Sequence, residues 1–334
     1  MRASYSEFEL IQRCFIDQGL GFERAGVSLG IGDDAALIQP PKDKVLAMSL
    51  DTLVAGVHFP TDAAPAQIAN RAFAVNLSDL AAMGAEPYCF TLGLTLPSPD
   101  AIWVSQFAEG LLPLAREFNC PLVGGDTTRG PLAIAIQVQG LVQAERALRR
   151  SGARVGDVIC VTGTLGDAAT ALLLLKADSH LGEDFCLTAT PTDEEEKFLL
   201  ARYFAPQARI GFATRCAELI SACLDISDGL AGDLNHILAA SGVGAEIELT
   251  QLPLSTATQR LLQPEFCRRA ALSGGDDYEL CFTAAASELA ELQSRGEALG
   301  VRVSAIGTIQ SEPGLRYCQG GERVDLAATG YRHF

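Results

Sequence analysis

The chain of 334 residues is 48% hydrophobic and 20% charged, and its formal net charge is −16. The length favours two domains over one, and the composition is typical of a soluble globular protein. The acidic balance argues against nucleic acid or an anionic membrane as a partner, because binding to either needs clustered Lys and Arg.

The ten cysteines are dispersed along the chain, and no Cys-x-x-Cys pair occurs. This pattern indicates small core residues in a reducing compartment rather than a zinc ribbon or a redox pair. Residues 1–9 lack the apolar stretch of a signal peptide, and the most apolar segment, 168–176, is too short to span a bilayer. We therefore expect a cytoplasmic protein.

Predicted strands and helices alternate along the chain, which indicates an α/β protein. The predicted strands are 45–50, 92–96, 132–142, 158–162 and 244–249. The predicted helices are 65–83, 99–118, 166–176, 209–220 and 230–240. The basic, glycine-containing stretch 149–157 is the expected boundary between α/β domains of residues 1–148 and 149–334. The acidic segment 177–197 is expected to be a surface excursion.

Four short segments, predicted to be turns, place glycine next to aspartate: 30–34, 124–126, 225–229 and 274–277. Glycine lets the backbone approach a ligand closely. Aspartate supplies the oxygen ligands that Mg²⁺ prefers, and no cluster of thiolates or imidazoles competes with them. The pattern predicts Mg²⁺ and, with it, a polyphosphate substrate.

The predicted helix 65–83 carries polar residues on apolar stripes. Ile68, Val75 and Asp79 share one stripe, and Asn76 lies on the neighbouring one. A carboxylate on a buried stripe is costly unless it is paired or binds a metal. Asp79 is therefore a candidate metal ligand, with capping of a neighbouring segment as the alternative.

Further candidates adjoin the acidic turns. Asp51 follows the strand 45–50, with Ser49 two residues before it, and ligands in α/β folds gather at the carboxyl ends of strands. His58, in the next loop, is a structural or a functional histidine. The turn containing Asp34 is either a plain turn or a metal site.

The segment 124–130 offers backbone N–H groups at Gly125 and a carboxylate at Asp126, as a phosphate and metal site requires. Neither the Walker nor the Rossmann glycine pattern occurs in the chain. Asp225, Ser227 and Asp228 precede the predicted helix 230–240. Capping a helix needs one such residue rather than three, which favours a ligand-binding role.

The motifs together resemble those of the thiamine-monophosphate kinase family, which belongs to the ATP-binding superfamily that includes aminoimidazole ribonucleotide synthetase. The matching segments cover nearly the whole chain: GIGDDAA at 30–36, SLDTLVAGVHF at 49–59, NLSDLAAMGAEP at 76–87, LVGGDTTRG at 122–130, RSGARVGD at 150–157, TGTLGDAA at 162–169, DISDGLAGDL at 225–234, GGDDYELCF at 274–282 and the closing GYRHF at 330–334.

The resemblance implies a two-domain, aminoimidazole ribonucleotide synthetase-like fold, in which the sheet of the N-terminal domain forms a homodimer. It implies ATP-dependent phosphorylation of thiamine monophosphate to thiamine diphosphate, the last step of its biosynthesis, with several Mg²⁺ ions. The implied Mg²⁺ ligands are Asp34, Ser49, Leu50 through its backbone carbonyl, Asp51, Asp79, Asp126, Asp225 and Asp228. The implied ATP contacts are Gly125, Asp126, Arg150 and Ser227, and the implied contacts of thiamine monophosphate are His58, Asp276 and Tyr331.

No catalytic base or covalent nucleophile is expected, since phosphoryl transfer depends mainly on positioning and charge neutralisation. One residue departs from the family pattern, because Asp276 stands where the family usually has glutamate. Among the relatives, selenophosphate synthetase would carry a reactive Cys or selenocysteine beside a lysine, and the hydrogenase-maturation protein would end in cysteine. A Ca²⁺-binding module is disfavoured, because the chain has no Asp-x-Asp-x-Asp-Gly loop.

Overall fold

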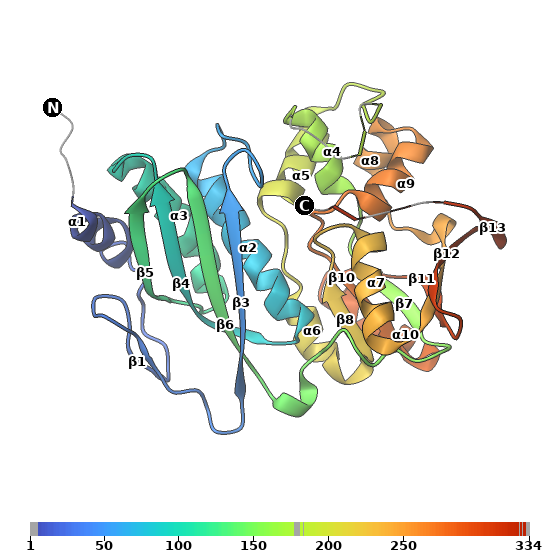
Figure 1. Ribbon diagram of the computed structural model, residues 1–334, viewed down its shortest axis with the longest axis horizontal. Helices are drawn as coiled ribbons and strands as arrows, with labels where there is room; N and C mark the ends of the chain where they lie inside the picture. Colours follow the sequence, from blue (N-terminus) through green and yellow to red (C-terminus); the bar gives the residue numbers. More distant parts are fainter. Residues whose placement is uncertain (1–5, 177–180, 183, 327, 329, 332–334) are drawn as a thin grey trace. The chain divides into compact units, whose positions relative to one another are not determined.

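The computed structural model describes residues 6–176, 181–182, 184–326, 328 and 330–331 (Figure 1). The chain divides into two compact units. Unit 1 is Met1–Leu80 with Ala85–Glu145, and unit 2 is Ala81–Gly84 with Arg146–Phe334. Of the expected surface excursion, 177–180 and 183 lie outside the described residues, as do 332–334 of the closing motif. No helix among the described residues is long and apolar enough to cross a membrane.

Unit 1 is built on a four-stranded sheet in the order β3-β6-β4-β5. β6 is antiparallel to both β3 and β4, whereas β5 is parallel to β4. The strands are β3 (Val45–Val54), β4 (Glu86–Leu96), β5 (Leu122–Arg129) and β6 (Ala133–Val142), and a separate hairpin pairs β1 (Val27–Leu29) with β2 (Leu37–Ile38). The helices are α1 (Glu7–Ile11), followed by a π-helical turn at Gln12–Ile16, α2 (Pro65–Ala82) and α3 (Ala101–Glu117).

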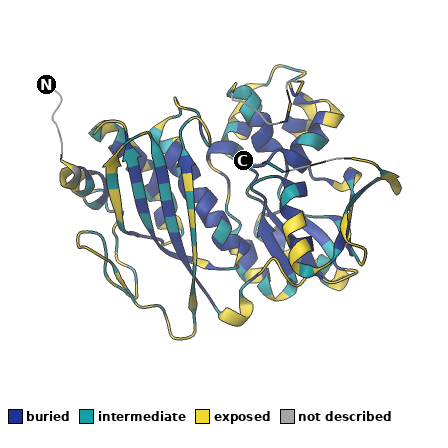
Figure 2. Cartoon of the chain, in the orientation of Figure 1, coloured by how far each residue is buried: buried dark blue, intermediate teal, exposed yellow. Residues whose placement is uncertain are grey.

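α2 packs on one face of this sheet, and α3 lies on the same side (Figure 1). Phe73 of α2 meets Phe90 of β4 with ring centroids 4.6 Å apart, and both side chains are fully buried. The opposite face is open. Met48 and Leu50 of β3 lie on it with 58% and 55% of their surface exposed, and exposed residues recur along β3 and β5 in Figure 2.

At β3 and β5 the structure departs from the sequence prediction in a way that places candidate residues within the sheet. β3 pairs with β6 along its full length to Val54, so Asp51 lies inside the strand rather than at its carboxyl end. The predicted turn at 124–126 is wrong, because β5 continues through both glycines to Arg129. Glycine is tolerated in β5 because this strand lies at the edge of the sheet and forms backbone hydrogen bonds with one neighbouring strand, β4.

Unit 2 contains a seven-stranded sheet in the order β13-β12-β9-β11-β7-β10-β8, in which only β12 and β9 are parallel among the described strands. Its strands are β7 (Val158–Thr162), β8 (Ala222–Asp225), β9 (Gly244–Glu248), β10 (Leu280–Ala284), β11 (Val303–Gln310), β12 (Gly314–Gln319) and β13 (Glu322–Val324). Its helices are α4 (Asp167–Leu174), α5 (Asp193–Phe204), α6 (Ile210–Cys216), α7 (Leu230–Ser241), α8 (Thr256–Leu261), α9 (Pro264–Ser273) and α10 (Leu289–Ala298).

The core of unit 2 forms where apolar strands meet the apolar face of α7. Leu224 of β8, Cys281 of β10 and Ile306 of β11 share one buried cluster with Leu234 and Ile237 of α7. Every residue of β8 and of β10 is buried. Such strands read as continuous apolar runs because neither face meets water. The loop that follows β8 and the loop that precedes β10 are therefore anchored on a rigid base.

The close approach of α2 and α3 generates a stability prediction. A Cβ atom added at Gly110 of α3 would lie 2.6 Å from the backbone of Ala66 in α2. We expect Gly110→Ala to lower the free energy of unfolding of unit 1 by about 1–3 kcal/mol, because the helices must move apart. Urea denaturation followed by fluorescence of Trp103, the only tryptophan in the chain, reports on this unit.

Gly30→Ala is the control for this prediction, because a Cβ there would meet only Val27, at 4.0 Å. This variant should unfold at nearly the same urea concentration as the unmodified protein. Equal midpoints for Gly110→Ala and Gly30→Ala would contradict the proposed contact.

Candidate functional site

In unit 1, β3 and α2 bring three of the predicted site residues together. Ser49 Oγ of β3 donates to Asp79 Oδ2 of α2 at 2.5 Å, and the backbone N–H of Asp51 donates to Asn76 Oδ1 at 3.1 Å. Ser49 and Asp51 lie two residues apart on one face of the strand. Because β3 is an edge strand, the N–H of Asp51 needs a partner outside the sheet, and the fully buried Asn76 provides it. The polar residues on the apolar face of α2 thus belong to one hydroxyl, amide and carboxylate cluster.

His58 closes the turn that follows β3. Its Nδ1 accepts a hydrogen bond from the backbone N–H of Val54 at 3.1 Å, and its carbonyl oxygen accepts one from Arg71 Nε at 2.9 Å. The neutral imidazole with Nδ1 as acceptor carries its proton on Nε2. The histidine therefore has a structural role through Nδ1, while its other nitrogen is a hydrogen-bond donor.

Three other predicted ligands of unit 1 lie apart from this cluster. Asp34 is exposed in the turn before β2. Asp126 pairs with Gly93 in a row that runs through Ala135 to Thr52, and that row faces the open side of the sheet, opposite Asp51. β6 and β4 lie between β3 and β5, so Asp126 and Thr52, at the two ends of this row, are roughly 14 Å apart. Leu50 also faces the open side and offers no side-chain oxygen.

In unit 2, hydrogen bonds between main chains lock three predicted segments together. The N–H groups of Asp276 and Tyr278 donate to the carbonyl oxygens of Ser227 and Ile226 at 2.7 and 2.8 Å. The N–H of Tyr331 donates to the carbonyl oxygen of Asp228 at 2.9 Å. The loop 225–229, the turn 274–279 and Tyr331 therefore form one surface, with Asp225 buried at the end of β8.

Glycines allow this close packing. A Cβ atom at Gly275, whose φ is +69°, would lie 2.7 Å from the carbonyl oxygen of Ser227. A Cβ atom at Gly229 would meet the backbone of Ser273 at 2.9 Å. The glycines of both motifs are thus required for the loops to touch, and this requirement explains why they accompany the aspartates.

Asp233 fixes the loop 225–229 from inside α7. Its Oδ2 accepts hydrogen bonds from the backbone N–H groups of Ser227 and Asp228, both at 3.0 Å. Burial raises the pKa of the Asp233 carboxyl to about 7, although the N–H of Asp228 and other donors lower it in part. Arg150, exposed at the start of unit 2, also lowers that pKa by its charge.

A group of charged residues that the sequence did not predict lies in the interior behind the turn 274–279. Glu279 accepts two hydrogen bonds from Arg209, at 2.6 and 2.5 Å, and one from Arg202 at 2.9 Å. Asp277 accepts from the backbone N–H of Gly166 with both oxygens, at 2.9 and 3.0 Å. Asp167 lies 3.4 Å from Arg202 Nε. Asp167, Asp277 and Glu279 are all nearly or fully inaccessible to solvent.

Burial raises the pKa of the Asp277 carboxyl well above its usual range, although Arg202 opposes the change. Burial also disfavours the charged form of Arg202, but Glu279 and Asp167 outweigh it, so the pKa of that guanidinium is raised. The signal in the sequence was the spacing, since Asp277 and Glu279 alternate with Asp276 and Tyr278 directly before an apolar strand.

The cysteines have the expected structural character. All ten are free thiols, eight are buried, Cys186 is exposed and Cys318 is intermediate. Burial raises the pKa of the Cys89 thiol to about 11 and that of Cys160 to about 12. These thiols are therefore poor nucleophiles.

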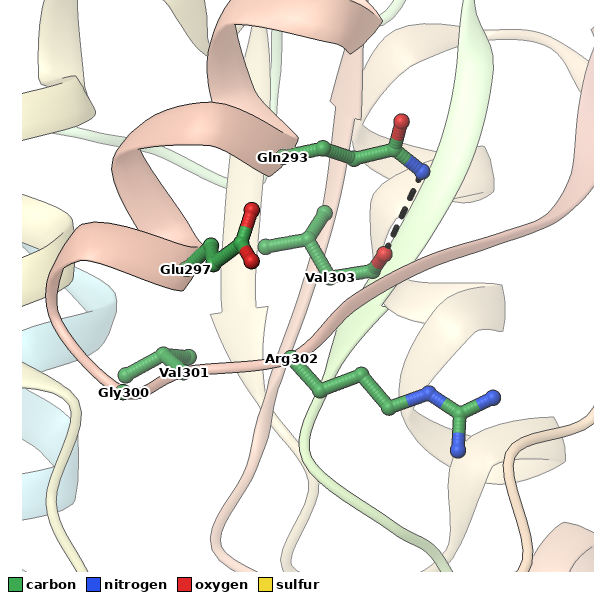
Figure 3. A pocket seen from close by; sticks show the side chains of 6 residues that line it. All are labelled: Gln293, Glu297, Gly300, Val301, Arg302 and Val303. Atoms are coloured by element: carbon green, nitrogen blue, oxygen red, sulfur yellow. Dashed lines mark hydrogen bonds between the residues drawn. The ribbon is translucent and has the colours of Figure 1, made fainter.

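A hollow of about 400 Å³ in unit 2 lies apart from these segments (Figure 3). It lies between the end of α10 and the start of β11, and Gln293 Nε2 donates across it to the carbonyl oxygen of Val303 at 3.4 Å. Arg302 points away from Glu297 in Figure 3. The hollow contains none of the predicted site residues.

The donors of the predicted site suit Mg²⁺, because they are carboxylate and hydroxyl oxygens. Among the described residues, no three His, Cys, Asp or Glu side chains converge to hold a metal by themselves.

Comparison with known proteins identifies the class of the fold. Residues 32–142 match the family model of the AIR synthase related protein, N-terminal domain, and residues 154–317 match that of its C-terminal domain. The chain is 44% identical to the thiamine-monophosphate kinase of Escherichia coli (strain K12) over 329 residues, 98% of each chain. It therefore belongs to the thiamine-monophosphate kinase family, as its motifs predict.

Solved structures agree with this assignment. The crystal structure of thiamine-monophosphate kinase from Stenotrophomonas maltophilia K279a has a TM-score of 0.84 and 42% identity, covering 96% of this chain and 98% of that one. A structure described as AaThiL complexed with AMPPCP and TMP has a TM-score of 0.72 and 29% identity, covering 98% and 97%. The α/β fold of two AIR synthase related domains is thus confirmed.

Proposed function

We propose that the protein transfers the γ-phosphoryl group of ATP to thiamine monophosphate, giving thiamine diphosphate and ADP, the last step of thiamine diphosphate biosynthesis. The observation that carries this conclusion is the 44% identity to a thiamine-monophosphate kinase along 98% of both chains. The complex of AaThiL with AMPPCP and TMP, which is similar in structure over 98% of this chain, supports both substrates.

The reaction needs little covalent help from the protein. A terminal oxygen of the acceptor phosphate attacks the γ-phosphorus of ATP, and the bond from that phosphorus to the leaving ADP oxygen breaks. A phosphate monoester loses its second proton with a pKa of about 6, so the acceptor is largely ionised at neutral pH. The protein therefore has to hold two anions in line rather than remove a proton.

Mg²⁺ ions would neutralise the phosphate oxygens of the two substrates. We assign their ligands to Ser49, Asp51 and Asp79 in the cluster of β3 and α2, to Asp34 and Asp126 elsewhere in unit 1, and to Asp225 and Asp228 in unit 2. The hydrogen bond from Ser49 to Asp79 supports the first group. Leu50 has the least support, because the N–H of Asp51 points out of the sheet and the Leu50 carbonyl therefore points toward β6.

The remaining assignments concern substrate contacts. ATP would be bound by Gly125, Asp126, Arg150 and Ser227, and thiamine monophosphate by His58, Asp276 and Tyr331. At Gly125 the strands approach so closely that a Cβ would lie 2.0 Å from the Leu92 carbonyl oxygen. The backbone contacts of Ser227, Asp228, Asp276 and Tyr331 support the assignments in unit 2.

The working form is a homodimer in the cytoplasm. The exposed Met48 and Leu50 on the open face of the unit 1 sheet support association through that face, since burying apolar area drives association. Asp126 of the predicted ligand set lies on the same face. The ten free thiols support a reducing compartment.

A direct assay tests the function. Purified protein with ATP, Mg²⁺ and thiamine monophosphate should form thiamine diphosphate and ADP in equal amounts, measured by chromatography. Thiamine in place of its phosphate should give no product, because it lacks the ionised acceptor. ATP consumption without thiamine diphosphate would refute the assignment.

The metal assignment predicts that Asp79→Asn loses activity while the fold is kept. We expect kcat/KM to fall by about 10- to 100-fold or more, with a shifted Mg²⁺ dependence, because one anionic ligand is removed. Asp62→Asn, an exposed aspartate outside the predicted site, is the control and should retain full activity. Unchanged turnover of Asp79→Asn across a Mg²⁺ titration would contradict the role of Asp79.

The acceptor assignment predicts a selective effect at Asp276. The thiazolium ring of thiamine monophosphate is cationic, so a nearby carboxylate favours its binding, although water weakens the attraction. Asp276→Ala should raise the KM for thiamine monophosphate about tenfold, which is ~1.4 kcal/mol, with little effect on the KM for ATP. Asp276→Glu should be tolerated. A larger effect on ATP than on thiamine monophosphate would overturn this assignment.

A further inference from the structure

The turn 274–279 has an unusual backbone. Gly275, Asp276 and Tyr278 have φ values of +69°, +60° and +48°. Side chains other than glycine rarely adopt this left-handed region, and such residues persist only where the surroundings determine the conformation. A bulky Tyr and an Asp held in this way need a specific anchor, and the inward side chains of the same turn provide one.

The side chains of the turn alternate between two environments. Asp276 and Tyr278 are half-buried, and Tyr278 Oη lies 3.4 Å from Asp276 Oδ1. Asp277 and Glu279 are 1% and 0% exposed. The first pair lies on the side assigned to thiamine monophosphate, and the second pair lies on the side of Arg202 and Arg209, whose side chains are 12% and 11% exposed.

Asp277 connects the turn to a separate segment of unit 2. Its two carboxyl oxygens accept the backbone N–H of Gly166, which precedes α4 and has a φ of +81°. Arg202 of α5 donates to the carbonyl oxygens of both Asp277 and Thr164, at 3.4 and 3.2 Å. The turn is therefore held from behind by α4 and α5, independently of its hydrogen bonds to the loop 225–229.

We propose that Asp277 is a positioning residue for the reaction. It fixes the turn so that Asp276 and Tyr278 present their side chains to thiamine monophosphate. Asp277 itself touches no substrate. This inference rests on the proposed function for the identity of the acceptor, but its structural half, the ordering of the turn, does not.

Asp277→Ala leaves the N–H of Gly166 without its acceptor and should release the turn. We expect the KM for thiamine monophosphate to rise about tenfold or more, because small displacements of binding groups are costly. The kcat and the KM for ATP should stay within about twofold, since Asp233 holds the loop 225–229 separately. Asp277→Asn keeps one acceptor oxygen and should restore most of the affinity.

Asp157→Ala is the matched control. Asp157 is 6% exposed and likewise accepts a backbone N–H, that of Arg154 at 3.0 Å, together with Ser221 Oγ at 2.6 Å. It lies outside the turn. This variant should lose stability without changing the KM for thiamine monophosphate, so a general effect of deleting a buried carboxylate would appear in both proteins.

Hydrogen exchange measured by mass spectrometry gives a readout independent of activity. In Asp277→Ala, the amides of Asp276 and Tyr278 should exchange faster, whereas those of Ser227 and Asp228 should not change. Faster exchange in a protein that makes no thiamine diphosphate would refute the proposed function and leave the anchoring role intact. Unchanged exchange, or an unchanged KM in an active enzyme, would overturn the inference.

A double variant separates positioning from direct contact. If Asp277 acts through Asp276, the double substitution Asp276→Ala and Asp277→Ala should be little worse than the more severe single one, whereas independent contacts would multiply their effects. Should Asp277→Ala fail to fold, Arg202→Lys serves in its place, because it keeps the charge but loses the forked donor to Asp277 and Thr164. It should shift the same KM in the same direction, and an unaltered KM would count against the anchor.

Discussion

The candidate surface of unit 2 is built on one buried carboxylate, that of Glu279. It is fully inaccessible to solvent and is held by the fork of Arg209, by Arg202 and by the hydroxyl of Thr162 at 2.6 Å. A buried charge is costly unless its partners satisfy it, and removing one partner leaves the others unpaired. β7, β10, α5 and the start of α6 are thereby tied to a single point, immediately behind the turn 274–279.

Unit 1 depends on a different constraint, the free edge of β3. An edge strand leaves backbone groups without ladder partners. Here α2 supplies Asn76 to the N–H of Asp51, and Asp79 to the hydroxyl of Ser49. The arrangement that satisfies the edge also brings one carboxylate from each element into the same cluster, Asp51 from β3 and Asp79 from α2. The edge of the sheet and the candidate metal site are in this sense the same structural feature.

The sequence predicted the parts of the fold that follow from local patterns. The helix predicted at 65–83 occurs as Pro65–Ala82, and the strand at 158–162 has the predicted bounds. The strand containing Gly124 and Gly125 was missed, because glycine weighs against a strand and pairing with β4 is a long-range effect. The run at 45–50 was cut short for the same reason, since its continuation depends on β6.

The candidate site shows the same division. Glycine beside aspartate marked two segments of unit 2 that lie against each other, 225–229 and 274–277. The contact itself was not predicted, because the steric need for these glycines arises between segments that are distant in the chain. The partners Arg202 and Arg209 could not be inferred, since they lie 75 and 70 positions from Asp277 and Glu279 in the chain. Nor could the position of Asp126 on the opposite face from Asp51, which depends on the register of four strands.

The buried group around Arg202 has an excess of acid, with Asp167, Asp277 and Glu279 facing two guanidinium groups. Because burial raises the pKa of Asp277 in the folded chain, while an unfolded aspartate titrates near ~3.9, folding takes up a proton at this position in the interval between those two pKa values. The contribution of Asp277 to stability is then complete at a pH below the unfolded value and declines as the pH rises toward the folded one. A proton is in this respect a structural component of unit 2, and a rise in pH toward the folded pKa of Asp277 removes it.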